Sequence, residues 1–266
     1  MKFALTLPQA QIKVAFEAAL VKAAQSTTIK GFRQGKAPLN LVSPTLDQNH
    51  LYEQVLNVLF PPAYSIYIKK NQLKPIIQPK LNLKTLDPQQ DWVIEVEIAE
   101  KPPVELKQYQ LAVKQALAKL KPKPEPKDQE SAVINLILDT LLKTCAVTIP
   151  PLLIDESVDY SLSKLVEQVN HLGLSLDKYL LSTNKTAASL RQEYATNATR
   201  DLQIEFILEA VADDLKLHPR QADIDQVVNK IKDPKTQQFV RADASSLTSI
   251  RTSLMRRQVL DHLKVL

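Results

Sequence analysis

Glycine is scarce and proline is abundant in this chain, which holds three glycines and seventeen prolines among 266 residues. Glycine supplies the backbone angles of tight turns and lets a backbone approach a ligand closely. A chain so poor in glycine can form few tight hairpins and no glycine-rich phosphate-binding loop. Because the aromatic share is only 5%, the core must consist mainly of Leu, Ile, Val and Ala. These features favour long helices.

The net charge of +5 is distributed unevenly along the sequence. Residues 1–127 hold eighteen Lys and Arg against ten Asp and Glu (+8), whereas residues 128–266 hold sixteen against nineteen (−3). A basic half indicates a polyanionic partner, of which RNA is the commonest. Charge alone is equally consistent with a solvated, lysine-rich surface, so both interpretations stay open.

The single cysteine, Cys145, excludes a disulfide within the chain and fits a reducing, cytoplasmic compartment. The apolar run at the start of the sequence is too short for a signal peptide. No apolar stretch approaches the roughly 18 residues that a transmembrane helix needs, so we expect no membrane partner.

Residues 1–100 show the pattern of a small α+β unit. Apolar residues alternate with others over 3–7, 81–86 and 92–98, as in strands. Helical apolar stripes lie between them, over about 12–23 and 51–70. Because proline removes a helix donor and clashes with the preceding turn, we expect a helix break at Pro61 and Pro62.

A proline- and lysine-rich stretch over residues 120–127 is typical of an extended, semi-rigid spacer. It predicts an α+β domain over residues 1–110, a linker over 111–127 and an all-α, elongated helical domain over 128–266. In the last part we expect no strand. Five helical stripes are predicted there, over about 133–141, 158–169, 187–216, 224–231 and 247–263.

The stripe over 187–216 is wider than one buried face requires, because apolar residues cover several sides of it between Leu202 and Leu215. Such a helix either packs on several sides or leaves apolar surface open. Both interpretations stay open here, since sequence does not separate a core from a binding surface.

Motifs of the common catalytic and metal sites are missing. The four histidines lie far from one another and from Cys145 in the sequence, so no zinc site is expected. Gly35 and Lys36 lack the Ser or Thr of a nucleotide-binding loop, and no Gly-x-Ser-x-Gly sequence occurs. Two acidic pairs, Asp155–Glu156 and Asp213–Asp214, are explained by helix capping and solubility. We therefore expect no cofactor, no metal and no catalytic residue.

The most specific feature is a short loop that holds two of the three glycines: Gly31-Phe32-Arg33-Gln34-Gly35-Lys36, followed by Ala37 and Pro38. Glycines at both ends permit a tight, projecting turn. Phe32 is a candidate apolar anchor, and Arg33 and Lys36 can meet carboxylate or phosphate groups. An exposed aromatic residue between cations is typical of an interaction hot spot. The alternative is that Phe32 packs into the core.

The sequence from Ile29 to Pro38 resembles the ribosome-docking signature of the bacterial trigger factor family. Further resemblances follow in the order of that family: residues 102–106 resemble the exit from its N-terminal domain, and residues 147–156 resemble the opening of its helical substrate domain. Residues 213–217 continue the likeness. The resemblance covers roughly 2–106 and 130–266; the loop is specific, whereas the helical part is diffuse.

The resemblance implies a ribosome-associated, ATP-independent chaperone that shields nascent polypeptides near the exit tunnel. It places Gly31, Phe32, Arg33, Gly35 and Lys36 in the docking loop. The implied partners are protein and RNA of the large ribosomal subunit at the peptide exit, unfolded or nascent polypeptides, and a second copy of the chain away from the ribosome. The family's prolyl isomerase domain and its first strand have no counterpart in this sequence, so no enzyme activity is expected, and one edge of the N-terminal sheet is expected to be open or differently covered.

The helical domain is expected to cradle the emerging chain through apolar residues with surplus exposure. Our candidates for this substrate-binding role are Val169, Ile207, Val211, Met255 and Val259. Two other functions stay open: a ribosome- or RNA-binding adaptor without chaperone action, and an extracytoplasmic chaperone related through the helical domain. The loop at 31–36 counts against the second of these.

Overall fold

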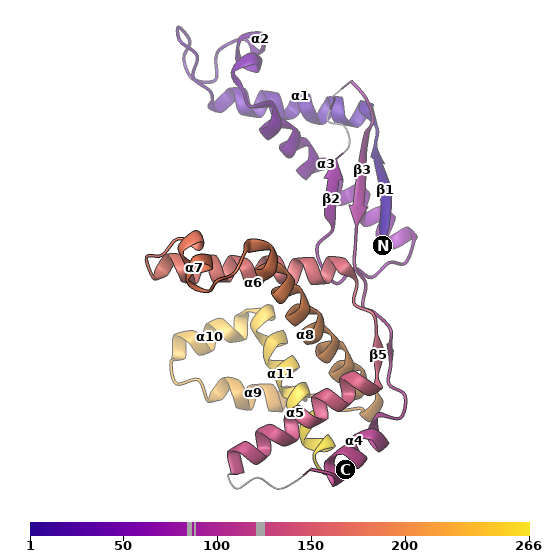
Figure 1. Ribbon diagram of the computed structural model, residues 1–266. Helices are drawn as coiled ribbons and strands as arrows, with labels where there is room; N and C mark the ends of the chain where they lie inside the picture. The colour runs from indigo at the N-terminus through magenta and orange to yellow at the C-terminus, as the bar shows by residue number, and fades with distance from the viewer. Residues whose placement is uncertain (84–86, 88, 121–125) are drawn as a thin grey trace. The chain divides into compact units, whose positions relative to one another are not determined.

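The computed structural model describes residues 1–83, 87, 89–120 and 126–266. They form two compact units, Met1–Lys101 and Pro102–Leu266, each with its own hydrophobic core (Figure 1). The first unit combines a small sheet with helices, and the second is almost entirely helical. The predicted fold class is confirmed.

The sheet of the first unit has three antiparallel strands, β1 (Lys2–Leu7), β2 (Lys80–Leu83) and β3 (Trp92–Glu97), in the order β1-β3-β2. The central strand β3 buries Trp92, Ile94 and Val96, while the residues between them are only half-buried. This alternation is the one that the sequence predicts. The end of the second predicted strand, residues 84–86, lies outside the described residues.

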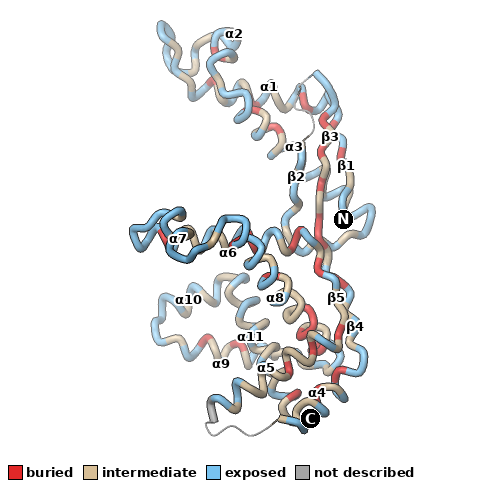
Figure 2. The backbone as a smooth tube through the Cα atoms, in the orientation of Figure 1, coloured by how far each residue is buried: buried red, intermediate tan, exposed pale blue. Residues whose placement is uncertain are grey.

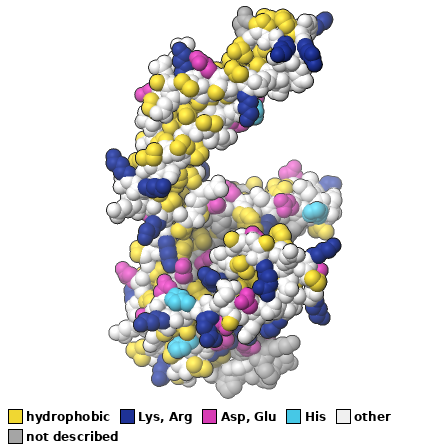
Figure 3. Space-filling view, turned by 180° about the vertical axis from the view of Figure 1, so that it is seen from behind, with side chains coloured by type: hydrophobic (Ala, Val, Ile, Leu, Met, Phe, Trp, Pro, Cys, Tyr) yellow, Lys and Arg dark blue, Asp and Glu magenta, His cyan; other side chains and the backbone are white. Residues whose placement is uncertain are grey.

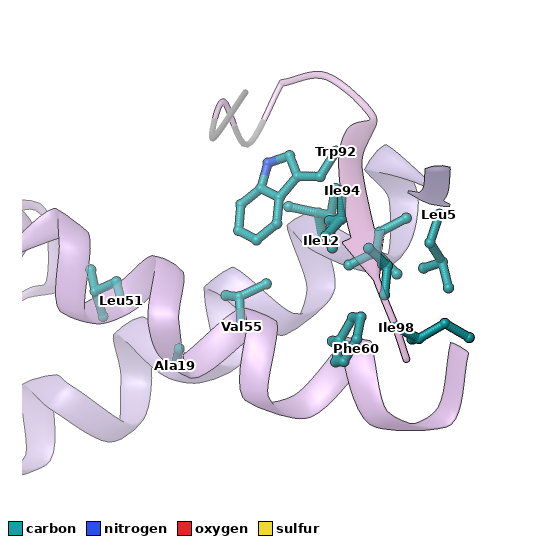
Figure 4. Close-up of a cluster of buried hydrophobic side chains, with 11 residues drawn as sticks. Leu5, Ile12, Ala19, Leu51, Val55, Phe60, Trp92, Ile94 and Ile98 are labelled. Carbon is teal, nitrogen blue, oxygen red and sulfur yellow. The ribbon is translucent and has the colours of Figure 1, made fainter. Parts of the chain in front are cut away.

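Two long helices pack against each other and against the sheet. They are α1 (Gln9–Ser26) and α3 (Gln48–Lys70), joined through α2 (Leu39–Val42) and a 3₁₀ helix, η1 (Ser43–Thr45). Ile12 from α1, Val55 and Phe60 from α3, and Ile94 from β3 meet in one core (Figure 4). The stripes of apolar residues on both helices therefore face the sheet.

The expected helix break at Pro61 and Pro62 is wrong, because α3 continues through both prolines. An interior proline costs roughly 3 kcal/mol in lost hydrogen bonding and steric conflict. Here Val55 and Phe60 before the prolines and Tyr67 after them pack into the same core. Burial on both sides offsets the local cost, so that tertiary packing outweighs the intrinsic preference.

The second unit begins with a two-stranded ribbon in which β4 (Val104–Glu105) pairs with β5 (Ala146–Val147). The expectation of no strand after Asp128 is therefore wrong, although β5 is too short to show any alternation of apolar residues. The helices of this unit are α4 (Tyr109–Ala118), α5 (Pro126–Thr144), α6 (Pro151–His171), α7 (Leu176–Ser182), α8 (Ala187–Leu215), α9 (Gln221–Asn229), α10 (Pro234–Ala242) and α11 (Ala244–Leu263).

Helix α8 is the centre of the second unit and contacts α5, α6 and α11. Phe206, Ile207, Leu208 and Val211 on it are all buried, and the tube in Figure 2 is red along this part of α8. The wide apolar surface of this helix is thus explained by packing on several sides. The alternative interpretation, that the helix leaves apolar surface open between residues 202 and 215, is wrong for these four residues.

The boundary between the units falls earlier in the chain than we predicted. Residues 102–110, assigned to the first domain, pack with the second unit, where β4 pairs with β5 and Tyr109 is buried. Residues 111–118 of the predicted linker belong to helix α4 (Tyr109–Ala118), which packs on α5. Residues 121–125 of that linker lie outside the described residues. Among the described helices, none combines the length and apolarity needed to cross a bilayer.

Candidate functional site

Residues 27–38 form a loop at the end of α1 that points away from the sheet of the first unit (Figure 1). The base of the loop is closed by hydrogen bonds. The Gly35 N–H donates to the Thr27 carbonyl oxygen over 3.3 Å, and the Gln34 side-chain amide donates to the Ser26 carbonyl oxygen over 3.0 Å. These bonds tie the returning chain to the last residues of α1 and hold the loop as a defined projection.

Two successive turns shape the loop. The Phe32 N–H donates to the Ile29 carbonyl oxygen over 3.0 Å, and the Lys36 N–H donates to the Arg33 carbonyl oxygen over 2.9 Å. Gly31 and Gly35 occupy the third position of these turns, with φ of +91° and +73°. A type II turn requires positive φ at this position, which favours glycine there. The two glycines of the sequence motif therefore have a direct geometric role.

Gly35 also lies against the end of α1. A Cβ atom added there would be 2.9 Å from the Gln25 carbonyl oxygen, closer than side-chain carbons approach such atoms. A Cβ added to Gly31 would meet nothing within 4 Å. Gly35 thus permits the loop to close on the helix, whereas Gly31 shapes its outer part.

The tip of the loop carries one exposed ring and two exposed cations. Phe32 is 41% exposed and is not part of the core cluster of its unit. Arg33 and Lys36 are exposed as well. The alternative interpretation, that Phe32 packs into the core, is therefore wrong. An aromatic ring that is kept in water by its own fold is available to a partner surface.

The chain segment that carries this tip holds charges of one sign. Between Glu17 and Asp47 the sequence holds no acidic residue, but it holds Lys22, Lys30, Arg33 and Lys36. Figure 3 shows Lys and Arg side chains beside hydrophobic ones at this end of the first unit. A run of cations without a carboxylate in the same chain segment favours a positive potential, which attracts phosphates or acidic protein surfaces.

Three further residues belong to this site, although we did not select them from the sequence. Leu39 and Leu41 on the short helix α2 are 42% and 47% exposed and enlarge the apolar surface beside the loop. Their signal was the apolar run directly after Pro38, which we could equally have assigned to a core. The Gln34 side-chain amide donates the hydrogen bond to the Ser26 carbonyl oxygen that closes the loop.

The predicted substrate-binding residues of the second unit are mostly core residues. Val169, Ile207, Val211 and Val259 are buried, with at most 3% exposure, so the expected surplus exposure is wrong for these four. Met255 is only partly buried and lies on a groove of about 610 Å³ between α8 and α11, beside Glu205 and Arg251. Helical periodicity shows which residues share a face but not whether another helix covers that face.

Exposed apolar side chains of the second unit lie elsewhere. Leu172 and Leu181, near the end of α6 and in α7, are 75% and 81% exposed, and Tyr160 on α6 is 61% exposed. Phe239 on α10 is 66% exposed. These exposed side chains, rather than the four buried candidates, are accessible to an unfolded polypeptide in solution.

Several titratable groups of the second unit are buried or paired within the fold. Burial raises the pKa of the Cys145 thiol to about 11 and that of the Tyr109 hydroxyl to about 12, so both stay protonated near neutral pH. Tyr109 also donates to an Asp214 carboxylate oxygen over 2.7 Å. The Asp155 carboxylate lies 3.7 Å from the Arg191 guanidinium. Among the described residues, no group of three or more His, Cys, Asp or Glu is arranged to hold a metal ion.

Comparison with known proteins agrees with this arrangement. The model of the bacterial trigger factor protein matches residues 1–132, and the model of the trigger factor C-terminus matches residues 112–264. A solved structure of the trigger factor chaperone, described for its promiscuous substrate recognition in folding and assembly activities, superposes with a TM-score of 0.62. It is 12% identical and covers 99% of this chain and 96% of that one, so it shows similarity of fold alone.

Curated relatives match a limited part of the chain. Trigger factor of Streptococcus pneumoniae (strain Hungary19A-6) is 34% identical over 104 residues, which are 39% of this chain and 24% of that protein. Trigger factor of Lacticaseibacillus casei (strain BL23) is 33% identical over 109 residues, or 41% and 24% of the two proteins. The chain therefore matches about a quarter of the length of these relatives.

Proposed function

Because the chain belongs to the bacterial trigger factor family, we propose that it is an ATP-independent chaperone that docks on the large ribosomal subunit and shields nascent polypeptides near the exit tunnel. The observation that carries this proposal is the loop of residues 27–38, which holds Phe32, Arg33 and Lys36 in water on a closed, glycine-shaped base.

The docking step follows from the chemistry of the loop tip. Phe32 provides apolar area that becomes buried against a ribosomal protein, with Leu39 and Leu41 beside it. Arg33 can hold a carboxylate or phosphate with two parallel hydrogen bonds, and Lys36 acts as a point charge. The preformed turns lower the entropy that is lost on binding, because the loop need not be ordered at that moment.

The chaperone step is assigned to the exposed apolar residues of the second unit. Leu172, Leu181 and Phe239 are separate, exposed anchors. Scattered apolar contacts of this kind bind loosely, with affinities on the order of micromolar, and need no nucleotide for release. A client can therefore leave by folding.

We place this activity in the cytoplasm and propose that it runs without a prolyl isomerase domain. The two family matches overlap over residues 112–132, so no unmatched segment separates them. Pairing with a second copy away from the ribosome stays a prediction, which sedimentation velocity of the purified chain would check.

Ribosome pelleting tests the docking step. The variant Phe32→Ala/Arg33→Ala/Lys36→Ala removes one ring and two cations from the tip. A matched control, Val14→Ala/Lys13→Ala/Lys69→Ala, removes one apolar side chain and two cations from exposed positions on α1 and α3 that lie outside the segment between Glu17 and Asp47. We expect the tip variant to lose most of its co-sedimentation with ribosomes and the control to keep it. Equal pelleting of both variants would refute the docking role of the loop.

Suppression of aggregation tests the chaperone step, and it distinguishes a chaperone from an adaptor that only binds ribosomes. We expect the purified chain, at several-fold excess, to delay aggregation of a chemically denatured test protein. Leu172→Ser/Leu181→Ser should weaken this delay at unchanged stability, because both side chains are in water. Ile207→Ala should instead lower the free energy of unfolding by about 2–4 kcal/mol. A chain that pellets with ribosomes but never delays aggregation would be an adaptor.

A further inference from the structure

The first unit has an open sheet edge at β1. Within the described residues, β1 pairs with β3 on one side and with no strand on the other (Figure 1). Met1 and Ile98 exchange both backbone hydrogen bonds, at 2.7 and 2.9 Å. Because hydrogen-bonded pairs alternate along an antiparallel ladder, the bonded residues of β1 are Phe3, Leu5 and Leu7.

The remaining residues of β1 therefore direct their backbone outward. The N–H and C=O groups of Lys2, Ala4 and Thr6 point to the free edge, and the side chains of all three are exposed. Such a row of donors and acceptors is a template for pairing with another extended chain. It selects the extended backbone of a partner rather than its sequence.

An apolar groove of about 470 Å³ runs along this same edge, between β1 and α3. Leu5 and Leu7 of β1 line one side, and Leu59, Ala63 and Ile66 of α3 line the other. Ile66 is 68% exposed although it is a large apolar residue. A strand added beside β1 would place every second side chain over this groove, since side chains alternate between the faces of a sheet.

The two ends of this groove differ in charge. Phe3 at the start of β1 stacks on Tyr67 of α3, with ring centroids 4.0 Å apart, so the last turn of α3 lies near the start of β1. Lys70 is in that turn, and among the described residues that line the groove it is the one charged side chain. In an antiparallel added strand, the C-terminal end would lie near Lys70, where a carboxylate is favoured.

We infer that the open edge of β1 is a second binding site for unfolded polypeptide, which adds an extended segment as a fourth, antiparallel strand. The segment has apolar residues at alternate positions and a carboxylate at its C-terminal end. The choice of an unfolded polypeptide rests on the proposed chaperone function. A second copy of the chain fits less well, because Leu5 and Leu7 of its own β1 are already buried in its core and cannot fill the groove.

The probe for this site is a dye-labelled heptapeptide with Val at alternate positions and a C-terminal Asp, followed by fluorescence polarisation with the full chain. Ala4→Pro removes an outward N–H without touching the bonds between β1 and β3, and Ala4→Ser is its matched control. We expect binding to Ala4→Pro to be about 10-fold weaker, as loss of an edge hydrogen bond and of strand geometry implies, and binding to Ala4→Ser to be unchanged.

Two further measurements guard against misfolding of the proline variant. Ile66→Glu leaves the strand intact but places a carboxylate in the apolar groove. This carboxylate disfavours apolar side chains and repels the C-terminal Asp of the peptide, so the variant should also bind the peptide more weakly. In hydrogen exchange of the wild-type chain, the peptide should slow exchange of the amides of Lys2, Ala4 and Thr6 but not those of Phe3 and Leu5, which already bond to β3.

Three results would overturn the inference: equal binding by Ala4→Pro and Ala4→Ser, absence of saturable binding to the wild-type chain, or exchange protection confined to the second unit. Self-association of the wild-type chain that the peptide cannot displace, and that Ala4→Pro abolishes, would assign the edge to a second copy instead. Ribosome pelleting of the same variants is independent of these outcomes. If the wild-type chain pellets with ribosomes and delays aggregation of the test protein while peptide binding fails, only this inference is wrong.

Discussion

Gly31 and Gly35 share positive φ but differ in their surroundings, and this difference makes them separable by mutation. Gly31 has open space where a side chain would lie, whereas Gly35 faces the Gln25 carbonyl oxygen. A Cβ atom at Gly31 would therefore meet only the intrinsic cost of the left-handed region. At Gly35 the same atom would also push the loop away from α1.

We predict that Gly31→Ala costs about 1–2 kcal/mol of stability and leaves the base of the loop closed. Gly35→Ala should cost more, about 2–3 kcal/mol, because steric conflict with the end of α1 adds to the same backbone cost. Denaturant unfolding of both variants measures the difference. Equal costs at the two positions would show that the close approach of Gly35 to Gln25 does not matter.

Cys145 is expected to be an unreactive thiol. Burial raises its pKa from 9.0 to about 11, so the thiolate fraction near neutral pH is about 100-fold below that of an ordinary cysteine. Alkylation of the folded chain should be slow at pH 7.5 and should rise with pH until about pH 11, where half the thiol is ionised. Alkylation in denaturant, where Cys145 has its ordinary pKa, is the control. Rapid modification of the folded chain at pH 7.5 would contradict this.

Single residues were predictable from the sequence where local backbone geometry decides their position. Gly31, Phe32 and Gly35 follow from a turn pattern, and the structure places them in turns at an exposed tip. Val169, Ile207, Val211 and Val259 were misjudged because their exposure depends on helices distant in sequence. Val259 and Ile207, for example, come from different helices and share one core.

Helix α3 shows how packing overrides a local preference at the scale of an element. Pro61 and Pro62 remove two N–H donors from its interior, yet the helix runs from Gln48 to Lys70. The helix keeps its course because residues on both sides of the prolines are anchored in the same core.

Replacement of one of these prolines should therefore stabilise the chain. Pro61 is exposed, and Pro61→Ala restores a donor for the carbonyl group of Asn57 without changing the core. We expect the free energy of unfolding to rise by about 1–2 kcal/mol, part of the gain being offset by the greater freedom of the unfolded chain. Thermal unfolding followed by circular dichroism measures this. A lower melting temperature would mean that proline is needed at this point of α3.

Long, periodic elements were predicted well, and most short ones were missed, although β2 and the nine-residue helix α9 fall on the predicted strand at 81–86 and stripe at 224–231. The strands at 3–7 and 92–98 and the helices around 133–141, 158–169, 187–216 and 247–263 are all present. Helices α7 and α10 span seven and nine residues, and β4 and β5 span two residues each. Elements this short show too few turns or alternations for a sequence pattern, and they exist because the surrounding structure holds them.

At the scale of the whole molecule, the uneven charge is consistent with different proposed roles for the two units, docking for the first and client binding for the second. The positive excess of the first part includes the acid-free segment between Glu17 and Asp47 that carries the loop. The second unit carries the exposed apolar residues at α6, α7 and α10. The proposed function thus places docking in the first unit and its client-binding residues in the second, and the inferred peptide site adds client binding at β1.

This division predicts a salt-dependent docking step. If Arg33 and Lys36 meet phosphates, each neutralised phosphate releases counterions, so log K for ribosomes should fall with log salt with a slope of about −2. The tip variant should lose most of this slope, and the matched control outside the segment should keep it. Binding that is insensitive to salt would instead assign docking to Phe32 and its apolar neighbours alone.

The central claim is that the loop tip itself touches the large ribosomal subunit, and site-specific photo-crosslinking tests it most directly. A photoreactive phenylalanine analogue replaces Phe32 in one sample and Val14, an exposed residue on α1, in another, and both are irradiated with purified ribosomes. We predict a covalent adduct with a large-subunit component from position 32 and little or none from position 14. Equal yields from the two positions, or no adduct from position 32 while the chain still pellets with ribosomes, would contradict the account.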